Sequence, residues 1–339
     1  MAASIPGRPA FCPYGPRRSS PPPPPSGRSS TSPTPKEADP RRGGAALAKG
    51  AKPVRVLDPE AETQLTIVGC GGTGGFVIKN ACRLVWGLKE QRRAAEGVPP
   101  LFGETLPGHV PEILLCDGDA VERKNIVRQD FVAADVGRPK AIVLADRASA
   151  AYGLEVRAYP RYVKEGTDLK QLAPEGGIVV GCVDNADTRR ILHEKLSSYD
   201  DVVYVDAGNA GVELPEDPAA LSRSELRKIR ESGWSGQVVC GVRKGGETLL
   251  HFPADVMPDL IESAGGPEDR VPDEVPCGQI VVSSPQRHAT NLWAAALIYD
   301  YLQDLLSDGT VLHASSFFDA RRKYVKSYAA IDELDQVAV

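Results

Sequence analysis

Leu65 to Gly75 read LTIVGCGGTGG, a short β-branched apolar run that stops in glycine and restarts as a helical pattern. Gly69, Gly71 and Gly74 have the G-x-G-x-x-G spacing. These glycines serve a tight turn, a close approach of backbone to phosphate, and close packing of the helix on the strand. The helix N-terminus beyond them offers free N–H groups and a positive dipole end to an anion. The stretch therefore predicts a strand, a turn and a helix that bind a nucleotide.

The chain after the glycine turn predicts a Rossmann-like, doubly wound α/β fold with a mostly parallel sheet. Helical spacing runs from Phe76 to about Arg93, and the three glycines and four prolines of residues 94–111 indicate a surface loop. Residues 113–117, ILLCD, are a near-continuous apolar run of the kind that forms parallel strands buried on both faces. Further strands are expected at residues 154–159, 178–182 and 202–206, and helices near residues 141–151, 168–172 and 188–196.

Residues 210–339 predict an antiparallel extension of that sheet. Residues 237–242 and 248–252 alternate like paired strands, and residues 311–314 and 324–328 suggest a closing hairpin. Helices are expected at residues 222–231 and 286–306, with a loop rich in proline and acid over residues 253–285. In the last helix one apolar face is expected to carry Ala289, Leu292, Ala296 and Tyr299.

The first 53 residues differ in composition from the rest of the chain. Pro21 to Pro25 is a proline run, and serine, arginine and glycine fill most of the remainder. Such a segment buries too little apolar surface to offset its ordering entropy, so residues 1–53 are expected to be a disordered tail. An arginine- and serine-rich leader also resembles a transit peptide, although its proline content opposes an amphipathic helix.

Composition narrows the class of protein. The net charge of −5 argues against binding of duplex nucleic acid, because phosphate neutralisation requires clustered Lys and Arg. The sequence contains neither an apolar run of the roughly 18 residues that a membrane helix needs nor a secretory h-region, so we expect a cytoplasmic protein. Its seven cysteines form no C-x-x-C pair, and Cys70, Cys82, Cys116 and Cys182 lie in apolar patterns typical of small buried hydrophobic residues.

Residues 117–141, DGDAVERKNIVRQDFVAADVGRPKA, follow the strand 113–117 directly. Ligands of open α/β sheets bind outside the carboxyl ends of the strands, so this segment is expected to lie at the nucleotide. A solvated polar loop is the alternative interpretation, but the segment stands between a strand end and an apolar helix. Its charged and polar residues include Asp119, Glu122, Arg123, Lys124, Asn125, Arg128, Gln129 and Lys140.

These residues resemble the ThiF/MoeB/HesA adenylyltransferases, relatives of the ubiquitin-activating enzymes. The resemblance covers about Leu65 to Asn209, and its motifs occur in the family's order, which is far more specific than a lone glycine turn. The proline- and glycine-rich loop after the first helix and the helix NLWAAALIYDYL look most similar to ThiF-type proteins of the bacterial PRTRC gene system. The motifs are the GCGGTG turn, D-x-D (Asp117, Asp119), V-E-x-x-N-x-x-R-Q (Val121 to Gln129), D-V-G-x-P-K (Asp135 to Lys140) and C-V-D-N (Cys182 to Asn185).

The resemblance implies an ATP-dependent adenylyltransferase that activates the C-terminal carboxylate of a small ubiquitin-fold or similar acceptor protein. An acyl oxygen attacks the α-phosphorus and pyrophosphate leaves, so the protein aligns the groups and neutralises phosphate charge. Arg128 and Lys140 are the expected catalytic cations, and Asp184 is the expected catalytic Mg²⁺ ligand. The expected nucleotide-binding residues are Gly69, Gly71, Gly72, Gly74, Asp117, Asp119, Asn125, Gln129 and Asn185.

The resemblance also implies an organisation for the whole chain. Residues 54–339 form one ThiF-type domain, with a nucleotide-binding core at residues 65–209 and an antiparallel extension at residues 210–339. The extension contains a crossover-type loop at residues 253–285 and the C-terminal helix. A homodimer is expected, in which a partner arginine completes the site; Arg42 and Arg55 are the candidates. Cys277 is the candidate nucleophile for a thioester step, although no activating base is evident near it.

Three alternatives stay open on the sequence. Asp184 or Asn185 could cap the helix that follows, without any metal. The fold could serve a nicotinamide-dependent oxidoreductase, but Asp117 lies 48 positions after Gly69 instead of about 20, and the histidines His193, His251 and His288 form no motif. A non-catalytic scaffold that binds ATP or a partner is the third alternative. The identity of the acceptor is not encoded in a recognisable motif.

Overall fold

The computed structural model describes residues 53–58, 62–95, 110–212, 222–262 and 286–330, all within the unit Leu47–Val339. The tail predicted at residues 1–53 lies outside these ranges, except for Pro53. Arg42 and Cys277 also lie outside them. Within the described ranges, no helix is both long and apolar enough to cross a membrane.

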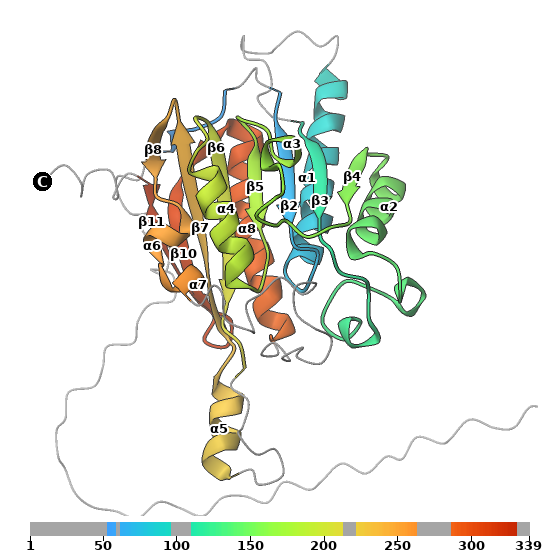
Figure 1. The fold of residues 1–339 in the computed structure, drawn as a ribbon, viewed down its shortest axis with the longest axis vertical. Coiled ribbons are helices and arrows are strands. Elements are labelled where there is room, and N and C mark those ends of the chain that lie inside the picture. The colour runs from blue at the N-terminus through green and yellow to red at the C-terminus, as the bar shows by residue number, and fades with distance from the viewer. Residues whose placement is uncertain (1–52, 59–61, 96–109, 213–221, 263–285, 331–339) are drawn as a thin grey trace, which may run out of the picture. The chain divides into compact units, whose positions relative to one another are not determined.

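Five parallel strands form the first half of the central sheet, in the spatial order β4-β3-β2-β5-β6 (Figure 1). Continuous apolar runs form these strands because helices cover both faces of the sheet. The order reverses between β2 and β5, so the loops after these two strands diverge and leave a crevice at their carboxyl ends. The strands are β2 (Gln64–Val68), β3 (Glu112–Cys116), β4 (Val156–Tyr159), β5 (Ile178–Gly181) and β6 (Val202–Asn209).

Antiparallel strands extend the sheet beyond β6, in the order β6-β7-β10-β11, with β8 paired to β7. A separate short pair, β1 with β9, joins the two ends of the described chain. The prediction of a mostly parallel α/β sheet with an antiparallel C-terminal part is therefore confirmed. The strands are β1 (Val54–Arg55), β7 (Ser235–Lys244), β8 (Glu247–Leu250), β9 (Thr310–Val311), β10 (His313–Asp319) and β11 (Tyr324–Ala329).

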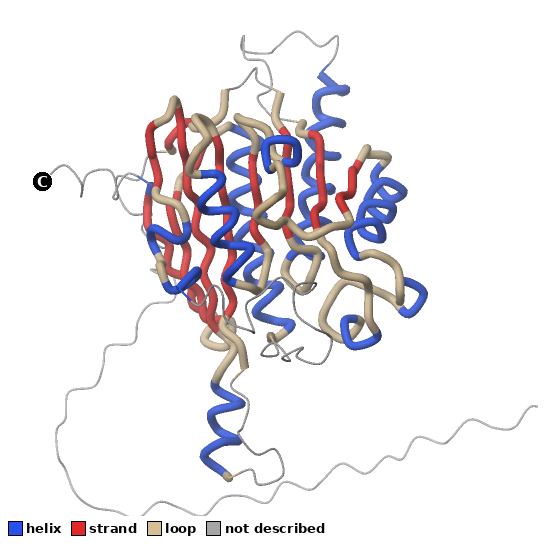
Figure 2. Tube along the Cα trace, in the orientation of Figure 1, coloured by secondary structure: helices blue, strands red, loops and turns tan. Residues whose placement is uncertain are grey.

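Helices cover the two faces of the sheet in separate layers (Figures 1 and 2). One apolar core lies under α1, α2 and α8, and a second lies under α3 and α4, beside which α6 and α7 pack. The helix α5 stands off the end of the sheet, and none of its residues is buried. The helices are α1 (Gly74–Ala95), α2 (Lys140–Tyr152), α3 (Leu169–Leu172), α4 (Ala186–Leu196), α5 (Arg223–Glu231), α6 (Pro253–Val256), α7 (Asp259–Glu262) and α8 (His288–Asp308).

The buried face of α8 differs from the expected one. Leu292 is 40% exposed, and the expected face of Ala289, Leu292, Ala296 and Tyr299 is not the buried one. The buried face instead begins with two polar residues, Thr290 and Asn291, and continues through Ala294, Ala295 and Ile298. The apolar pattern gave the wrong buried face because two polar side chains form hydrogen bonds on the face that is buried. Thr290 donates to the carbonyl of Gly233, and Asn291 Oδ1 accepts from Asn209.

Two other segments differ from the prediction. Strand β6 continues through Ala207 and Gly208 to Asn209, because β7 pairs with it along this whole length. The segment after β8 is not wholly a loop, since α6 and α7 occupy its first part. Pro253 opens α6, and buried Phe252 anchors it with its ring 5.8 Å from the ring of Tyr204.

Candidate nucleotide site

The glycine turn after β2 has no space for side chains at two of its positions. Gly69 has φ +98°, and a Cβ there would lie 2.6 Å from the carbonyl oxygen of Cys182. A Cβ at Gly74 would lie 1.8 Å from the carbonyl oxygen of Gly69. The first glycine therefore permits the turn and its approach to the loop after β5, and the second permits α1 to start against the turn.

A cavity, partly open to solvent, lies over this turn at the crevice between β2 and β5. The cavity brings together most of the predicted site residues. They are Gly69, Gly71, Gly72, Asp117, Asp119, Arg128, Gln129, Lys140, Asp184 and Asn185.

Asp117 joins the end of β3 to the glycine turn. Its Oδ2 accepts a hydrogen bond of 2.6 Å from the amide of Cys70, and its Oδ1 accepts one of 2.7 Å from the amide of Asp119. Burial raises the pKa of the Asp117 carboxyl to about 6, with Lys140 acting in the opposite direction. A carboxylate has about four acceptor positions, so two remain for the predicted ribose contact.

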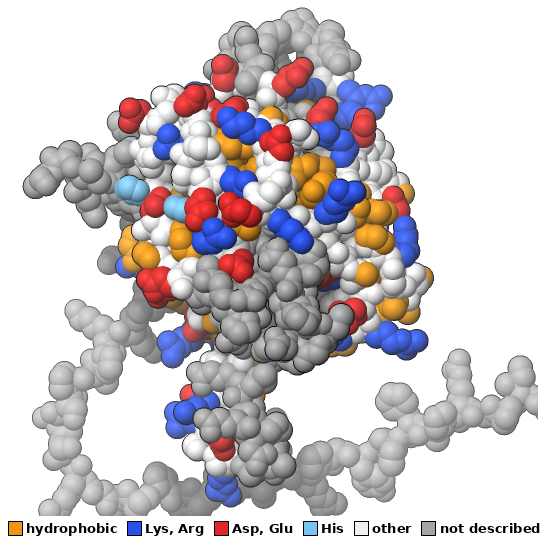
Figure 3. Space-filling model, in the orientation of Figure 1, with side chains coloured by type: hydrophobic (Ala, Val, Ile, Leu, Met, Phe, Trp, Pro, Cys, Tyr) orange, Lys and Arg blue, Asp and Glu red, His pale blue; other side chains and the backbone are white. Residues whose placement is uncertain are grey.

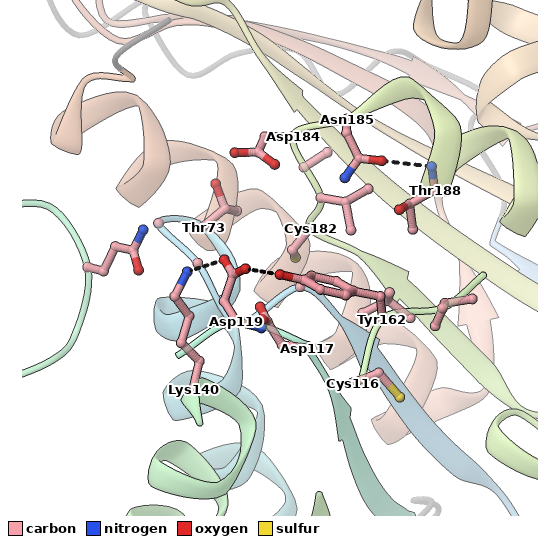
Figure 4. Close-up of a pocket in the computed structure, with 18 of the residues that line it drawn as sticks. Thr73, Cys116, Asp117, Asp119, Lys140, Tyr162, Cys182, Asp184, Asn185 and Thr188 are labelled. Atoms are coloured by element: carbon pink, nitrogen blue, oxygen red, sulfur yellow. Dashed lines mark hydrogen bonds and ion pairs between the residues drawn. The ribbon is translucent and has the colours of Figure 1, made fainter. Parts of the chain in front are cut away.

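Lys140 and Asp119 form an ion pair of 2.6 Å in the cavity, and the Tyr162 hydroxyl donates to the other oxygen of Asp119 (Figure 4). The residues are 21 positions apart, and the chain between them folds back so that the Lys140 amide donates to the Asp119 carbonyl. Lys140 is only 5% exposed. Burial alone would lower its pKa, but Asp117 and Asp119 outweigh this effect and raise it, so Lys140 stays charged.

The pKa of Asp119 changes in the opposite sense. Burial is the largest single effect and acts to raise the pKa, but the charge of Lys140 and the hydrogen bonds from Lys140 and Tyr162 together lower the pKa below its ordinary value. Asp119 is therefore a carboxylate at neutral pH that fixes the ammonium group of Lys140 at the wall of the cavity.

Arg128 and Gln129 reach the cavity from the loop between β3 and α2, whereas Asn125 does not line it. The Asn125 Oδ1 accepts a hydrogen bond from the amide of Glu122 and thereby holds the loop. Gln129 Oε1 is buried and has no hydrogen-bond partner within the described residues. A buried acceptor without a partner is costly, so this oxygen fits a ligand that donates a hydrogen bond.

Asp184 and Asn185 follow β5 and have distinct environments. Asn185 caps α4, because its Oδ1 accepts a hydrogen bond of 2.8 Å from the amide of Thr188. Asp184 is exposed at the edge of the cavity and accepts no hydrogen bond from the described residues. Figure 4 shows its carboxylate beside Asn185, above Thr73 in this view. The capping role proposed for Asp184 or Asn185 therefore belongs to Asn185.

A buried ion pair supports the loop that carries Asp184. Arg189 Nε lies 3.0 Å from Asp206 Oδ1, and Arg189 Nη2 donates to the carbonyls of Val183 and Ala207. The Tyr204 hydroxyl donates to the second oxygen of Asp206. Burial raises the pKa of Asp206, and Arg189 opposes this effect. This pair was not among the predicted site residues.

A second unpredicted group links the glycine turn to the C-terminal helix. Asn209 Nδ2 donates to Thr73 Oγ1 and to Asn291 Oδ1, each at 2.9 Å. Asn291 is 0% exposed, and a Cβ at Gly72 would lie 2.2 Å from its Nδ2. Two polar atoms of this cluster, Asn209 Oδ1 and Asn291 Nδ2, are buried without partners in the described chain. No local motif signals this cluster, because its members come from the glycine turn, β6 and α8.

Arg55 and the three histidines named from the sequence lie away from the cavity, whereas two of the cysteines, Cys116 and Cys182, line it. Arg55 donates to the carbonyl of Asp308, next to the β1–β9 pair. His193, His251 and His288 are absent from the cavity lining. Cys70, Cys82, Cys116 and Cys240 are buried, and burial raises the pKa of each thiol; Cys182, also with a raised pKa, is half-buried.

The doubly wound sheet and the glycine turn at a helix N-terminus define a Rossmann-like fold, and the cations lie around the crevice where such folds bind their ligands. Residues 60–214 match the model of the ThiF family. No curated protein matches the sequence.

Three solved structures match the chain at low identity. A crystal structure of E. coli MccB is 16% identical, covers 79% of this chain and 62% of its own, and has a TM-score of 0.48. E. coli MccB with ATP is 17% identical, with coverages of 79% and 64% and a TM-score of 0.45. Selenomethionine PaaA is 15% identical, with coverages of 79% and 64% and a TM-score of 0.47. The chain thus spans less than two thirds of each of these proteins.

Proposed function

We propose that this chain is an ATP-dependent adenylyltransferase that activates the C-terminal carboxylate of an acceptor protein. The observation that carries the proposal is the convergence of Arg128, Lys140 and Asp184 on one cavity above the glycine turn. ThiF-family members are typically adenylyltransferases, and residues 60–214 match that family. A redox nicotinamide would need a proton-transfer partner, and the three histidines considered for that role do not line the cavity.

The cations of the site suit the charge that develops during adenylation. As the acyl oxygen attacks the α-phosphorus, negative charge builds on the phosphate oxygens and on the departing pyrophosphate. The Arg128 guanidinium offers a fork of N–H donors, and the Lys140 ammonium offers a compact charge held by Asp119. The free N–H groups at the start of α1 face the same space. The protein thereby orients the reactants and stabilises the transition state.

Asp184 is suited to Mg²⁺, which prefers oxygen ligands and shares them with substrate phosphates. Its carboxylate is exposed at the cavity and receives no hydrogen bond from the described residues, so it is available as a ligand. Within the described residues no three acidic, His or Cys side chains gather as a metal site, so phosphate oxygens would supply the other ligands. When bound, Mg²⁺ would neutralise phosphate charge and assist the departure of pyrophosphate.

The remaining predicted residues have proposed supporting roles. Asp117 would hold the ribose and the glycine turn together, and Gln129 Oε1 would accept a hydrogen bond from the nucleotide. Asn125 and Asn185 would act through the backbone, since each binds an amide of its own loop or helix. The acceptor is proposed to be a small ubiquitin-fold or similar protein. A homodimer and a PRTRC-type context stay proposals drawn from the sequence.

ATP–pyrophosphate exchange tests this function directly. The chain is expected to exchange labelled pyrophosphate into ATP when ubiquitin-fold candidate acceptors with a free C-terminus are supplied. Lys140→Gln is expected to reduce exchange by at least about a hundredfold, because it removes a charge that faces the transition state. Lys79→Gln is the matched control, since Lys79 is exposed on α1. Binding of NAD together with no exchange for any acceptor would refute the proposal in favour of the oxidoreductase.

A further inference from the structure

Figure 1 shows α5 extending from the end of the sheet at which β6 ends and β7 begins. Strand β6 ends at Asn209, which lines the cavity, and the chain returns to the sheet at Ser235, where β7 begins. The helix between them spans Arg223–Glu231 and lies beyond the segment 60–214 that matches the ThiF family. Its position therefore places it beside the route into the cavity.

Side chains from the body of the protein fix the C-terminal end of α5. Arg287 donates to the carbonyls of Ile229 and Ser232, at 2.5 and 2.8 Å. The carbonyl of Arg230 accepts hydrogen bonds from the Trp234 indole at 2.8 Å and from Arg321 at 2.5 Å. These bonds satisfy carbonyls that a helix end leaves without partners. A helix held this firmly presents its outer face in a defined orientation.

That outer face carries a stripe of arginine. Arg223, Arg227 and Arg230 have i, i+4, i+7 spacing, so they lie along one side of the helix. All three are exposed, and Arg227 pairs only with the exposed Glu231. Figure 3 shows Lys and Arg side chains on α5 at the lower end of the molecule. Leu226, 39% exposed, lies beside the stripe and adds apolar area.

The base of α5 adds positive charge, most of it without a carboxylate partner in the described residues. The Arg287 and Arg321 guanidinium groups lie 4.3 and 5.8 Å from the centre of the same Trp234 ring. Neither guanidinium forms an ion pair with a carboxylate within the described residues. Burial, and after it the charge of Arg321, lowers the pKa of Arg287. Arg322 follows in the β10–β11 turn, is 84% exposed and pairs with Asp319 at 3.7 Å.

We propose that this basic surface, formed by the α5 stripe with Arg287, Arg321 and Arg322, docks an acidic surface of a partner protein. The chain has a net charge of −5, so a local excess of arginine is a specific feature and not a general property. Arginine and tryptophan are both enriched at protein interfaces, and Trp234 is half-buried under these arginines. The stripe is about 10 Å long at 1.5 Å per residue, which is short for a nucleic-acid backbone contact that depends on many phosphates.

The partner is most simply the acceptor protein, an assignment that rests on the proposed function. The acceptor must bring its C-terminal carboxylate to the cavity over the glycine turn. Gln286 lines that cavity, and its neighbour Arg287 holds α5, so a protein docked on the basic surface is already at the entrance. The charge on the surface would select acidic acceptors and accelerate their encounter.

Fluorescence anisotropy with a labelled dodecaglutamate peptide tests the surface on the full chain. The double variant Arg223→Glu and Arg230→Glu is expected to weaken binding by at least about tenfold at low ionic strength. Both side chains are exposed, and neither pairs with a carboxylate in the described chain, so folding should be retained; thermal melting checks this. The matched control is Arg83→Glu with Lys89→Glu, two exposed residues of α1, expected to change affinity less than twofold, about 0.4 kcal/mol.

Three outcomes decide the inference. Equal weakening by the α5 variant and the α1 control would show nonspecific attraction and would overturn it. Tighter binding of a dodecathymidylate oligonucleotide than of the peptide would overturn it in favour of nucleic acid. Selective loss in the α5 variant supports it. Exchange assays distinguish the docking proposal from the proposed adenylation function. If the wild-type chain shows no exchange but still binds the peptide through α5, only the adenylation function is refuted.

Discussion

Replacement of Asp184 by alanine separates a metal ligand from a helix cap. Asp184 is exposed and accepts no hydrogen bond from the described residues, so Asp184→Ala should change the free energy of unfolding by no more than about 0.5 kcal/mol. The same change should reduce ATP–pyrophosphate exchange by at least about a hundredfold, because it removes the proposed oxygen ligand of Mg²⁺.

Replacement of the neighbouring residue, Asn185, is expected to give the opposite pattern, a loss of stability in place of a loss of exchange. Asn185→Ala removes the bond to the Thr188 amide, which should cost about 1 kcal/mol and lower Tm by about 2–4 °C. Asp187→Ala is the charge-matched control, since Asp187 lies in the first turn of α4 and does not line the cavity. Exchange and thermal melting are measured on all three variants.

Two results would refute this reasoning. If Asp184→Ala lowered Tm as much as Asn185→Ala, the Asp184 carboxylate would be a structural group. If Asp184→Ala and Asp187→Ala reduced exchange equally, the effect would come from charge near the N-terminus of α4 and not from a ligand at the cavity.

Three further outcomes follow from the site. Gly72→Ala should lower the free energy of unfolding by about 1–3 kcal/mol, because its Cβ would lie 2.2 Å from Asn291 Nδ2. In urea unfolding, the double variant with Asn291→Ala should lose less stability than the sum of the two single variants. Arg189→Met should cost about 3–5 kcal/mol by leaving Asp206 buried and unpaired, and adding Asp206→Asn should restore part of that loss in the same unfolding assay. ATP affinity measured by calorimetry should fall below pH 6, as Asp117 takes up a proton and can no longer accept both backbone hydrogen bonds as a carboxylate; a flat profile between pH 5 and 7.5 would contradict this. The pKa of Asp117 is raised from 3.8 to about 6 in the folded chain, so between these two pH values the folded chain binds more protons at Asp117 than the unfolded chain. The contribution of Asp117 to stability therefore decreases as pH rises from 3.8 to about 6.

The nucleotide crevice could be predicted from sequence because its determinants are local. Each apolar run ends at the sheet edge, and the residues that follow, Gly69, Asp117 and Asp184, come to the same cavity in the structure. A strand end fixes the position of the next residue or two, so motifs directly after strands are placed by the fold alone. Lys140 also lines this cavity, although 21 residues separate it from Asp119; its role there stays a prediction.

The rest of the site depends on contacts that sequence patterns do not contain. Thr73 and Asn291 are 218 positions apart, and their cluster forms only when α8 packs against α1. The buried side of α8 includes polar residues, so the helical spacing of apolar residues wrongly placed Leu292 on the buried face. The Arg189–Asp206 pair was missed for a similar reason, since an arginine in a first helical turn is usually a solvated residue.

The link between Asn291 and the glycine turn also has a consequence for the order in which the chain matures. A ribosome has made β2, the turn and β3 long before it reaches residue 291 of 339. Until α8 emerges, Asn209 lacks one of its two acceptors, and the α1 side of the core is uncovered. The crevice therefore becomes complete only after α8 has been synthesised, so the ATP affinity proposed for this chain should appear in a nascent chain only once that helix has emerged.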